Sequence, residues 1–532
     1  MADATKVEVV KTENQHGKIY WFFRHTRDKI KGFARKHIIS FIIMVIVALI
    51  AMFLLRVFFH PLAIGLRQHL GILIVGLPML AMMWIMVRKG SIKKRIVIWS
   101  LYLILGVLTY YYGRDCYDYF AFYYRYNTLV TVDLDELPIS GHERIQPLNS
   151  IYSLAHEVMA ESESPTRPSF VRIDNDYRWT MAVQPAYPLS QLLGGMNEII
   201  NVSGTSPSPN FSKDNRIKAE FMVGENLRLS HNTNTAIIKR FGFWRFFNYE
   251  PSDIIYIKDD NGGWVQVISL IHWTGIFFPI PEFGGVIVIK QEAYGFKSLA
   301  KLVLLGTGDW IQPKEVNNYN YLVGQDILSF DVSRYMANSF RFQAGFFAPF
   351  PGYHLGDVRI PDLPEDINEQ PFTAHFQIGE SENNTLYHYF ALEPFDPNQQ
   401  GLNTSLFIPA DGSGPIYVYK HFNHNRSMIG VSAISAKVME SRKNYDWSRN
   451  FPVENRPFIR KIDGQIRFFW LTTVVTTKQT DGGNKFIAGN IPELVITDAS
   501  YNAPVWVNTL EPDKWEDELK AKLSYVWSNK NQ

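Results

Sequence analysis

The chain has 532 residues, a formal net charge of +2 at pH 7 and a single cysteine, Cys116. This length exceeds that of one ordinary domain, and the near-neutral charge argues against a nucleic-acid-binding protein, because phosphate recognition normally requires a basic domain. One cysteine also excludes disulfides within the chain and zinc sites built from several cysteines.

Three apolar segments near the N-terminus predict three transmembrane helices, at residues 38–59, 71–87 and 96–112. The first has about twenty apolar positions, which is the length that a bilayer core requires. The second and third have seventeen residues each and carry no charge. Three such segments in succession argue against buried helices of a soluble protein, and the late start of the first argues against a cleavable signal peptide.

Basic residues beside these segments predict the orientation of the chain. Residues 1–37 carry nine lysines and arginines, residues 88–95 carry five, and the loop at residues 60–70 carries only Arg67. We therefore expect an integral protein of the cytoplasmic (inner) membrane, with its N-terminus in the cytoplasm and everything after residue 112 in the periplasm or outside the cell. A large exported domain without disulfides suits a bacterial or archaeal envelope. The basic residues expected at the membrane surface are Arg24, Arg27, Lys29, Lys31, Arg35, Lys36, Arg88, Lys89, Lys93, Lys94 and Arg95.

Two segments beside the predicted helices are typical of a membrane surface. Residues 17–37 mix aromatic residues with cations, as expected of a helix lying on an anionic leaflet. Residues 113–143 form a stem, and the stretch at residues 110–126 is mostly Tyr and Phe, which indicates either an aromatic belt or a packing seam between protomers. We expect the lipid bilayer as one partner. The candidate interface residues are Tyr110, Tyr111, Tyr112, Tyr117, Tyr119, Phe120, Tyr123 and Tyr124.

Four stretches of the remaining chain predict β-hairpins, because short β-branched or aromatic runs flank turns of Gly, Asn or Asp. They are residues 169–185, 252–273, 386–420 and 456–475, and we interpret them as divergent repeats. Residues 283–295 extend the second hairpin, and residues 492–508 extend the fourth.

Helices are expected between these hairpins at residues 144–162, 427–443 and 511–527, where apolar residues recur at three- and four-residue steps. The predicted fold class is a multi-domain membrane protein. Its extracytoplasmic part is α+β and β-rich, with antiparallel hairpin repeats covered by helices. It divides into a first outer subdomain (144–300), a connecting region rich in Pro and aromatic residues (301–385) and a second outer subdomain (386–532). Within the connecting region, the prolines of residues 340–372 favour an irregular wrap or an exposed binding loop over long helices or central strands.

The order of these elements resembles a known family. A helix that leads into a hairpin, followed by a strand and a turn such as VITDASYNAPVWV, is similar to the PepSY-type module, in which a helix covers a small sheet. The resemblance involves three of the four hairpins. It implies an inhibitory, regulatory or assembly domain on an envelope protein, without chemistry of its own.

Catalytic signatures are absent from the sequence. The GTGDWI segment (306–311) lacks the third glycine of a dinucleotide-binding turn, and GVSAI (430–434) lacks the final glycine of a nucleophile elbow. The best metal candidates are His421 and His424, with His388 on a neighbouring strand, although histidines in a surface turn explain the same pattern. The acidic turn KDDNGGW (258–264) fits ordinary hairpin chemistry better than a cation or sugar site. We expect no cofactor and no catalysis.

The leading hypothesis is therefore a structural, assembly or partner-binding protein of the cell envelope. Its expected partners are further copies of the chain or other membrane-protein subunits, because symmetric homo-oligomers are the commonest assemblies. One alternative is a receptor or enzyme module that acts on a polysaccharide or a peptide through aromatic platforms and acidic loops. Another is an accessory subunit of a transport or energy-transducing complex.

Overall fold

The structure is a computed structural model. It describes residues 38–74, 76–78, 100, 113, 115–206, 211, 215–292, 295–363, 370–379, 385–396, 398–399, 401–424, 427–462, 464–479, 485–487, 493–507, 517 and 521–522. The chain forms two compact units, Met1–Pro61 and Leu62–Gln532. The features below belong to the second unit unless α2 is named.

Helix α2 (Ile38–Gln68) contains the first predicted transmembrane segment and continues past it. Among the described residues, no single helix has the length and apolar composition to cross a membrane, whereas the pair Leu55–Gln68 and Leu70–Pro78, bent by 71°, meets both criteria together. The rest of the second predicted segment, most of the third, the basic residues of 1–37 and 88–95, and nearly all of the predicted C-terminal helix lie outside the described residues.

The second unit is rich in β-structure, as predicted, and its described strands form four sheets. The first sheet contains β3 (Glu163–Pro165), β4 (Ser169–Ile173), β5 (Asp176–Pro185), β6 (Met196–Ser203) and β7 (Arg216–Phe221). The second contains β8 (Tyr249–Lys258), β9 (Trp264–Thr274), β10 (Ile280–Lys290) and β11 (Asp309–Ile311). The third contains β1 (Thr131–Asp133), β2 (Ile139–Gly141), β12 (Val358–Arg359), β13 (Phe372–Gln377), β14 (Leu386–Pro394), β15 (Thr404–Pro409) and β16 (Ile416–Lys420). The fourth contains β17 (Asn450–Ile462), β18 (Gln465–Gln479), β19 (Lys485–Ile487), β20 (Glu493–Asp498) and β21 (Ala503–Val507).

All four predicted hairpin stretches are antiparallel strand pairs. Residues 169–185 form β4 and β5, whose turn places Asp174 and Asn175 at φ values of 52° and 64°. Two consecutive residues with positive φ are what a tight hairpin turn requires, and Asp and Asn tolerate this conformation. Residues 252–273 form β8 and β9, residues 386–420 form β14 to β16, and residues 456–475 lie in β17 and β18.

The third sheet draws strands from three of the predicted regions. Strands β1 and β2 come from the predicted stem, and β13 comes from the predicted connecting region. Strand β1 pairs in parallel with β16, with Thr131 opposite Ile416. Parts of the stem and of the connecting region therefore belong to the sheet. The sequence did not predict this, because a long-range pairing leaves no local periodicity.

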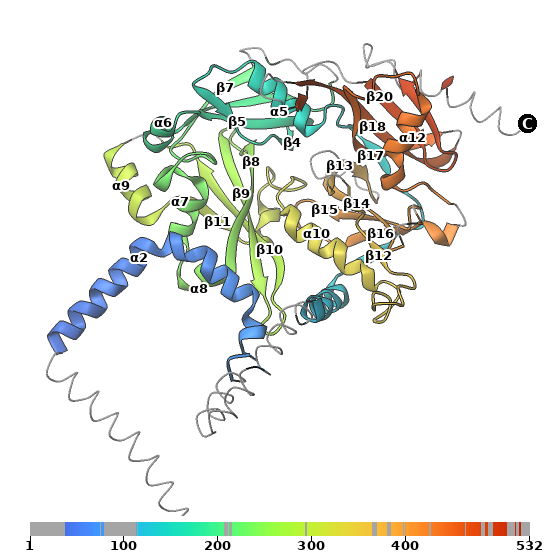
Figure 1. The fold of residues 1–532 in the computed structure, drawn as a ribbon. Helices are drawn as coiled ribbons and strands as arrows, with labels where there is room; N and C mark the ends of the chain where they lie inside the picture. The colour runs from blue at the N-terminus through green and yellow to red at the C-terminus, as the bar shows by residue number, and fades with distance from the viewer. Residues whose placement is uncertain are drawn as a thin grey trace, which may run out of the picture. The chain divides into compact units, whose positions relative to one another are not determined.

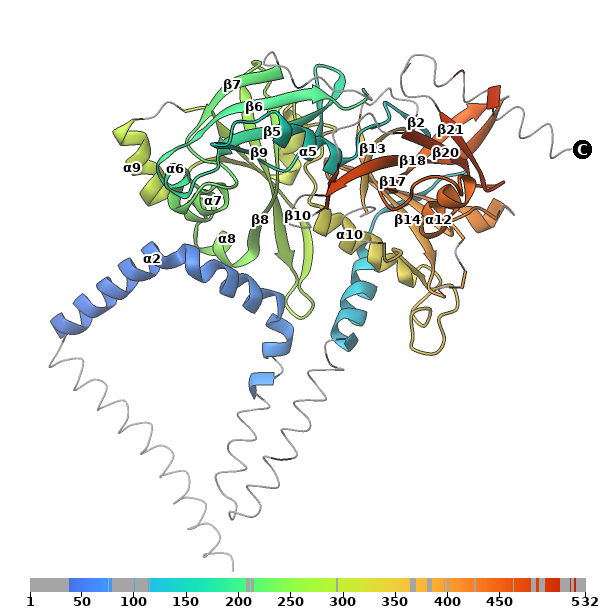
Figure 2. The ribbon, with the colours of Figure 1, turned by 45° about the horizontal axis from the view of Figure 1, so that its top comes forward.

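Helices lie against the sheets (Figure 1 and Figure 2). They are α5 (Leu148–Glu157), α6 (Pro188–Leu193), α7 (Thr233–Arg240), α8 (Phe243–Asn248), α9 (Phe296–Leu305), α10 (Phe330–Ser339) and α12 (Val431–Ser441), with short 3-10 helices η2 (Leu229–His231), η3 (Pro313–Asn318), η4 (Phe340–Phe342) and η5 (His421–His424). The predicted helices at 144–162 and 427–443 correspond to α5 and α12. Pro147 is the N-cap of α5.

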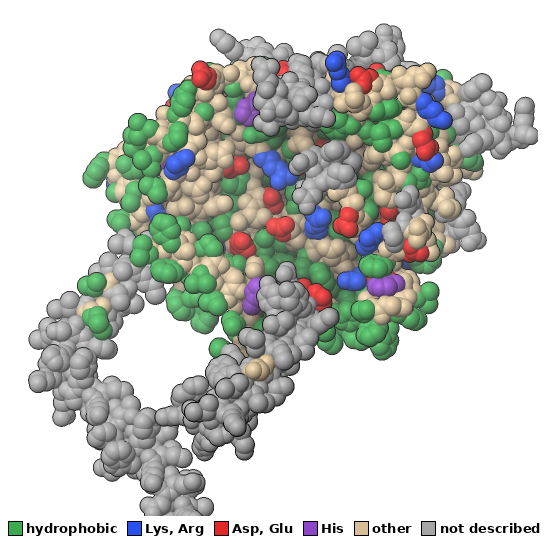
Figure 3. Space-filling view, in the orientation of Figure 1, with side chains coloured by type: hydrophobic (Ala, Val, Ile, Leu, Met, Phe, Trp, Pro, Cys, Tyr) green, Lys and Arg blue, Asp and Glu red, His purple; other side chains and the backbone are tan. Residues whose placement is uncertain are grey.

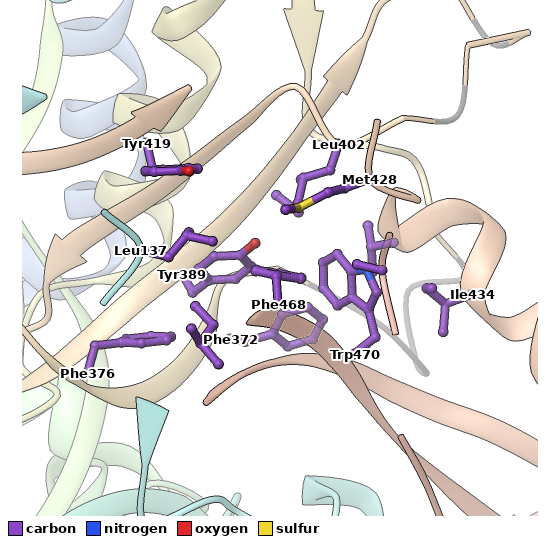
Figure 4. Packing of buried hydrophobic residues seen from close by; sticks show 14 of the residues in the cluster. Leu137, Phe372, Phe376, Tyr389, Leu402, Tyr419, Met428, Ile434, Phe468 and Trp470 are labelled. Carbon is purple, nitrogen blue, oxygen red and sulfur yellow. The ribbon is translucent and has the colours of Figure 1, made fainter. Parts of the chain in front are cut away.

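The third sheet is buried on both faces. Consecutive residues of a strand point to opposite faces, and Tyr389 and Phe390 of β14, both 0% exposed, belong to two different core clusters. The first cluster joins the third sheet to the fourth sheet and α12, as Figure 4 shows around Tyr389, Trp470 and Ile434. The second cluster joins the opposite face to α10. The third sheet therefore packs against the fourth sheet and α12 on one face and against α10 on the other.

Candidate functional site

A cavity of about 690 Å³ opens where elements of all four sheets come together, and it adjoins a second cavity of about 340 Å³. Acidic and basic side chains lie close together in the middle of the face shown in Figure 3. The charged lining residues of the two cavities, which we call the central cleft, are Arg144, Arg167, Glu225, Asp253, Asp326, Asp331, Arg334 and Glu454.

Glu225 lies on a turn that follows β7. The turn is held against β5 because the backbone N–H of Asn226 donates to Oε1 of Gln184 at 2.8 Å. Gly224 lies close to the same side chain, since a Cβ would be 2.7 Å from Nε2 of Gln184. The hydroxyl of Tyr256 donates to Oε1 of Glu225 at 2.8 Å. Burial raises the pKa of Glu225 to about 7, so this carboxyl group can gain or lose a proton near neutral pH.

Asp253 lies in a bulge of β8, where the register with β9 shifts between Pro251 and Ile254. Bulges redirect side chains and are common beside active sites. The carboxylate accepts hydrogen bonds from the backbone N–H of Phe330 at 3.1 Å and from the Ser252 hydroxyl at 3.2 Å. Burial raises the pKa of Asp253 despite these two donors, and the negative charge of Asp326 acts in the same direction.

Asp326 precedes α10 and accepts two hydrogen bonds from the third sheet. Oδ1 lies 2.7 Å from Nε2 of His388, and Oδ2 accepts from the Thr373 hydroxyl at 3.0 Å. His388 is 0% exposed, and its ring packs against Phe330 at a centroid distance of 5.0 Å. This pair fixes the start of α10, and with it the backbone N–H that binds Asp253.

Arg144 and Glu454 form the side of the cleft next to the fourth sheet. Their ion pair measures 2.6 Å, and the Arg144 guanidinium lies 5.1 Å from the ring centre of Trp179. Glu454 lies in a bulge of β17, has a φ of 48° and accepts a hydrogen bond of 2.8 Å from the backbone N–H of Leu148 at the start of α5. A non-glycine residue in the left-handed region is strained, and such residues cluster at functional sites.

Arg167 lies at the cleft and is exposed. No hydrogen bond or ion pair of its guanidinium is found within the described part of the chain. Its charge opposes the upward shifts of the pKa values of Glu225 and Asp253. The cleft therefore offers a cation with free donors beside carboxyl groups that can accept hydrogen bonds or carry a proton.

Two of the histidines considered as metal candidates, His421 and His388, lie close to other side chains. His421 is 1% exposed, and its Nε2 lies 2.9 Å from the hydroxyl oxygen of Ser405, while His388 pairs with Asp326 instead. The side chain of His424 lies outside the described residues. Among the residues that the structure does describe, no group of three or more His, Cys, Asp or Glu side chains is placed to hold a metal ion.

The predicted aromatic interface residues divide into two groups. Tyr119 and Tyr123 pack inside the unit, with ring centres 5.3 and 4.8 Å from that of Phe346. Tyr117 packs against Phe278 at 5.4 Å. The remaining described candidates, Phe120 and Tyr124, are 47% and 50% exposed. Tyr110, Tyr111 and Tyr112 lie outside the described residues.

The sequence interpretation missed the charged residues of the cleft. They are spread from residue 144 to residue 454 and lie on two strands, on α10 and in loops, so no short motif contains them. One signal was present, because Ser252 and Asp253 directly precede the apolar and aromatic run Ile254–Ile257 of the same strand. A polar pair in such a strand indicates a bulge or a site that faces a cavity.

No known family model matches the chain, and no curated protein or solved structure is significantly similar to it. The function must therefore be argued from the geometry of the cleft and from the chemistry of its residues.

Proposed function

We propose that the chain is a membrane-anchored receptor or enzyme module of the cell envelope, whose central cleft binds a peptide with a free carboxylate. The observation that carries this proposal is the convergence of side chains of both charge signs on one cavity of about 690 Å³. Cavities of this size are typical of sites for small ligands.

A peptide end matches the charges of the cleft. The Arg167 guanidinium has free donors that can bind a carboxylate in a bidentate manner. Glu225 and Asp253, deeper in the wall, can accept hydrogen bonds from an ammonium or amide group. A neutral polysaccharide would leave these charged groups without partners, which favours the peptide over the sugar.

A binding experiment on the full chain in detergent tests the proposal. Trialanine is titrated by calorimetry, next to its C-terminal amide and a neutral oligosaccharide of similar size. We expect trialanine to bind more tightly than the amide, and Arg167→Gln to remove this preference while the protein stays folded, because Arg167 is exposed. Arg228→Gln, at another exposed arginine, is the matched control. Binding of the oligosaccharide alone, or of neither compound, would exclude a peptide site.

The membrane anchor is part of the same proposal. The apolar segments at 38–59, 71–87 and 96–112 support it, as does the bent helix pair Leu55–Gln68 and Leu70–Pro78. The basic segments support a cytoplasmic N-terminus and an outer C-terminal domain. Protease treatment of intact spheroplasts tests the orientation: the domain after residue 112 should be digested, whereas a protected domain would reverse the topology.

Self-association through the stem is a second candidate function, in line with the PepSY-type resemblance and an assembly role. It is favoured by Phe120 and Tyr124, which stay half exposed beside an aromatic cluster that is otherwise packed. Mass photometry of the detergent-solubilised chain should give a homo-oligomer, or a complex with other membrane subunits, that Phe120→Ser with Tyr124→Ser disrupts. A monomer at all concentrations would exclude it.

A further inference from the structure

Large apolar side chains are exposed along one margin of the second unit. They lie on α8, on the β9–β10 turn and in the loop after η4, and we call them the apolar rim: Phe243 (68% exposed), Trp244 (78%), Phe247 (37%), Ile276 (61%), Phe277 (58%), Phe347 (65%) and Phe350 (51%). Most exposed apolar residues of a soluble surface are scattered singly, whereas α8 alone exposes Phe243, Trp244 and Phe247.

The apolar rim is continuous with the segments that lead to the predicted transmembrane helices. Arg67 joins α8 to the second sheet, because its Nε donates to Oδ1 of Asn248 at 2.7 Å and its Nη2 donates to the backbone oxygen of Trp273 at 2.8 Å. Gly71 lies so close to the β9–β10 turn that a Cβ would approach the Phe277 oxygen to 1.9 Å.

The chain returns to the same margin after the third predicted helix. Tyr117 and Phe120 contact Phe278 at ring distances of 5.4 and 6.2 Å. Gly71, the first residue of the apolar stretch at 71–87, and Tyr117, which follows the stretch at 96–112 in the sequence, therefore both lie beside the β9–β10 turn of the apolar rim. This places the rim where a bilayer would meet the domain.

A cavity of about 460 Å³ lies next to α8 and is lined by Arg240, Arg245, Asp309 and Trp310, among other residues. The Arg245 guanidinium stacks on the Trp310 ring at 3.8 Å and makes no hydrogen bond or ion pair with the described residues. Trp310 is itself fixed, because its Nε1 donates to the Gly284 oxygen at 3.1 Å. Nε of Arg240 donates to the Gly308 oxygen at 3.4 Å, which leaves its terminal nitrogens facing solvent or a ligand.

We propose that the apolar rim inserts into the surface of the bilayer and that the Arg240–Arg245 cavity binds the phosphate of an anionic glycerophospholipid. Arginine binds phosphate oxygens through its planar set of donors, and Trp and Phe prefer the boundary between headgroups and acyl chains. Docking would hold the central cleft at a fixed height above the membrane. The inference rests on the membrane anchor proposed above.

Docking depth is measured on the full chain in nanodiscs. In a Cys116→Ser background, single cysteines at Trp244, at Phe58 of α2 and at Tyr501 in the β20–β21 turn carry a fluorophore, and nitroxide-labelled lipid is the quencher. We expect strong quenching at positions 244 and 58 and little at position 501. Quenching at 58 but not at 244 would refute docking while leaving the anchor in place, and no quenching at either position would refute both.

Lipid charge tests the phosphate site. We expect quenching at position 244 to rise roughly two-fold when phosphatidylglycerol replaces part of the phosphatidylcholine, and Arg240→Gln with Arg245→Gln to remove this increase. Arg442→Gln is the matched control, since Arg442, at the end of α12, also stacks on a tryptophan, Trp506 of the fourth sheet, at 3.7 Å. If lipid charge has no effect while inorganic phosphate binds through the same two arginines, the cavity serves a soluble anion and the proposal is wrong.

Discussion

Replacing Glu225 with Gln should stabilise the protein at alkaline pH and change its stability little at acidic pH. The pKa of Glu225 is raised from 4.5 to about 7 in the folded protein. Between these two pH values, the folded state holds a proton that the unfolded state has released. The free energy of unfolding therefore falls as the pH rises through this range, and it stays constant above it.

The size of the effect follows from the shift in pKa. Each pKa unit corresponds to about 1.4 kcal/mol, so the rise from 4.5 to about 7 costs the wild-type protein about 3 kcal/mol at pH 8. Glutamine has nearly the same shape, accepts the hydrogen bond from Tyr256 and does not titrate. For a domain of roughly 400 residues, a gain of this size raises the melting temperature by about 3 to 4 °C.

Thermal unfolding of the full chain in detergent, followed by tryptophan fluorescence from pH 5 to pH 8, measures this difference. Glu161→Gln is the control, because Glu161 is exposed; its melting temperature should follow that of the wild type at every pH. A Glu225→Gln protein that is less stable than the wild type at pH 8, or equally stable at all pH values, would refute the assignment of a raised pKa to this carboxyl group.

Three further substitutions probe the cleft and its frame. Tyr256→Phe removes the hydroxyl that donates to the Glu225 carboxylate, which should raise the pKa of Glu225 further. The pH above which stability stays constant should therefore be higher in the same fluorescence series. Gly306→Ala should lower the free energy of unfolding by more than about 2 kcal/mol, because φ is 73° and a Cβ would approach the Ala236 oxygen to 1.9 Å. Gly262→Ala is its control: φ is 79° but the space around it is open, so the loss should be only about 1 kcal/mol. Glu454→Ala should lower the free energy of unfolding by about 3 kcal/mol, because it leaves the Arg144 side chain, which is 10% exposed, without its partner and uncaps α5. Glu440→Ala, in an exposed ion pair, is its control and should lower the free energy of urea unfolding by less than about 1 kcal/mol.

The hairpins were predictable because their information is local. Alternation of apolar and polar residues over a few positions indicates a strand, and residues that tolerate positive φ indicate a turn. Asp174 and Asn175 illustrate this, since the same two residues that identify the turn in the sequence adopt φ values of 52° and 64° in the structure. Helix α12 was predictable for the same reason, from apolar residues on one face.

The pairing of the strands was not predictable in this way. Strand β1 lies beside β16, although the paired residues Thr131 and Ile416 are far apart in the chain. The charged residues of the cleft depend on such pairings, since Asp326 reaches Thr373 and His388 only because α10 packs on the third sheet. A single sequence records each of these residues as an ordinary polar position.

Aromatic residues were also ambiguous in the sequence. Tyr123 and Tyr124 are neighbours in the stem, yet the Tyr123 ring packs against Phe342 at 5.4 Å and Tyr124 is 50% exposed. Composition predicts that such a segment is buried against something, but it does not distinguish the chain itself from a lipid or a second protomer. The partners of the stem appear only when the loop after η4 is placed beside it.

The central cleft lowers the stability of the folded protein, and this loss of stability is an argument for a functional role. Replacing buried ionic groups with apolar side chains of similar volume is often neutral or stabilising, so the junction of four sheets does not require charges. Here Glu225 and Asp253 keep pKa values raised by burial, and Glu454 holds a strained φ of 48°. His388 and Asp326 stabilise this arrangement but do not reduce the cost of the other carboxyl groups. A polar, strained junction with a free guanidinium at Arg167 is what a binding or catalytic site requires, whereas a purely structural junction would be more stable without it.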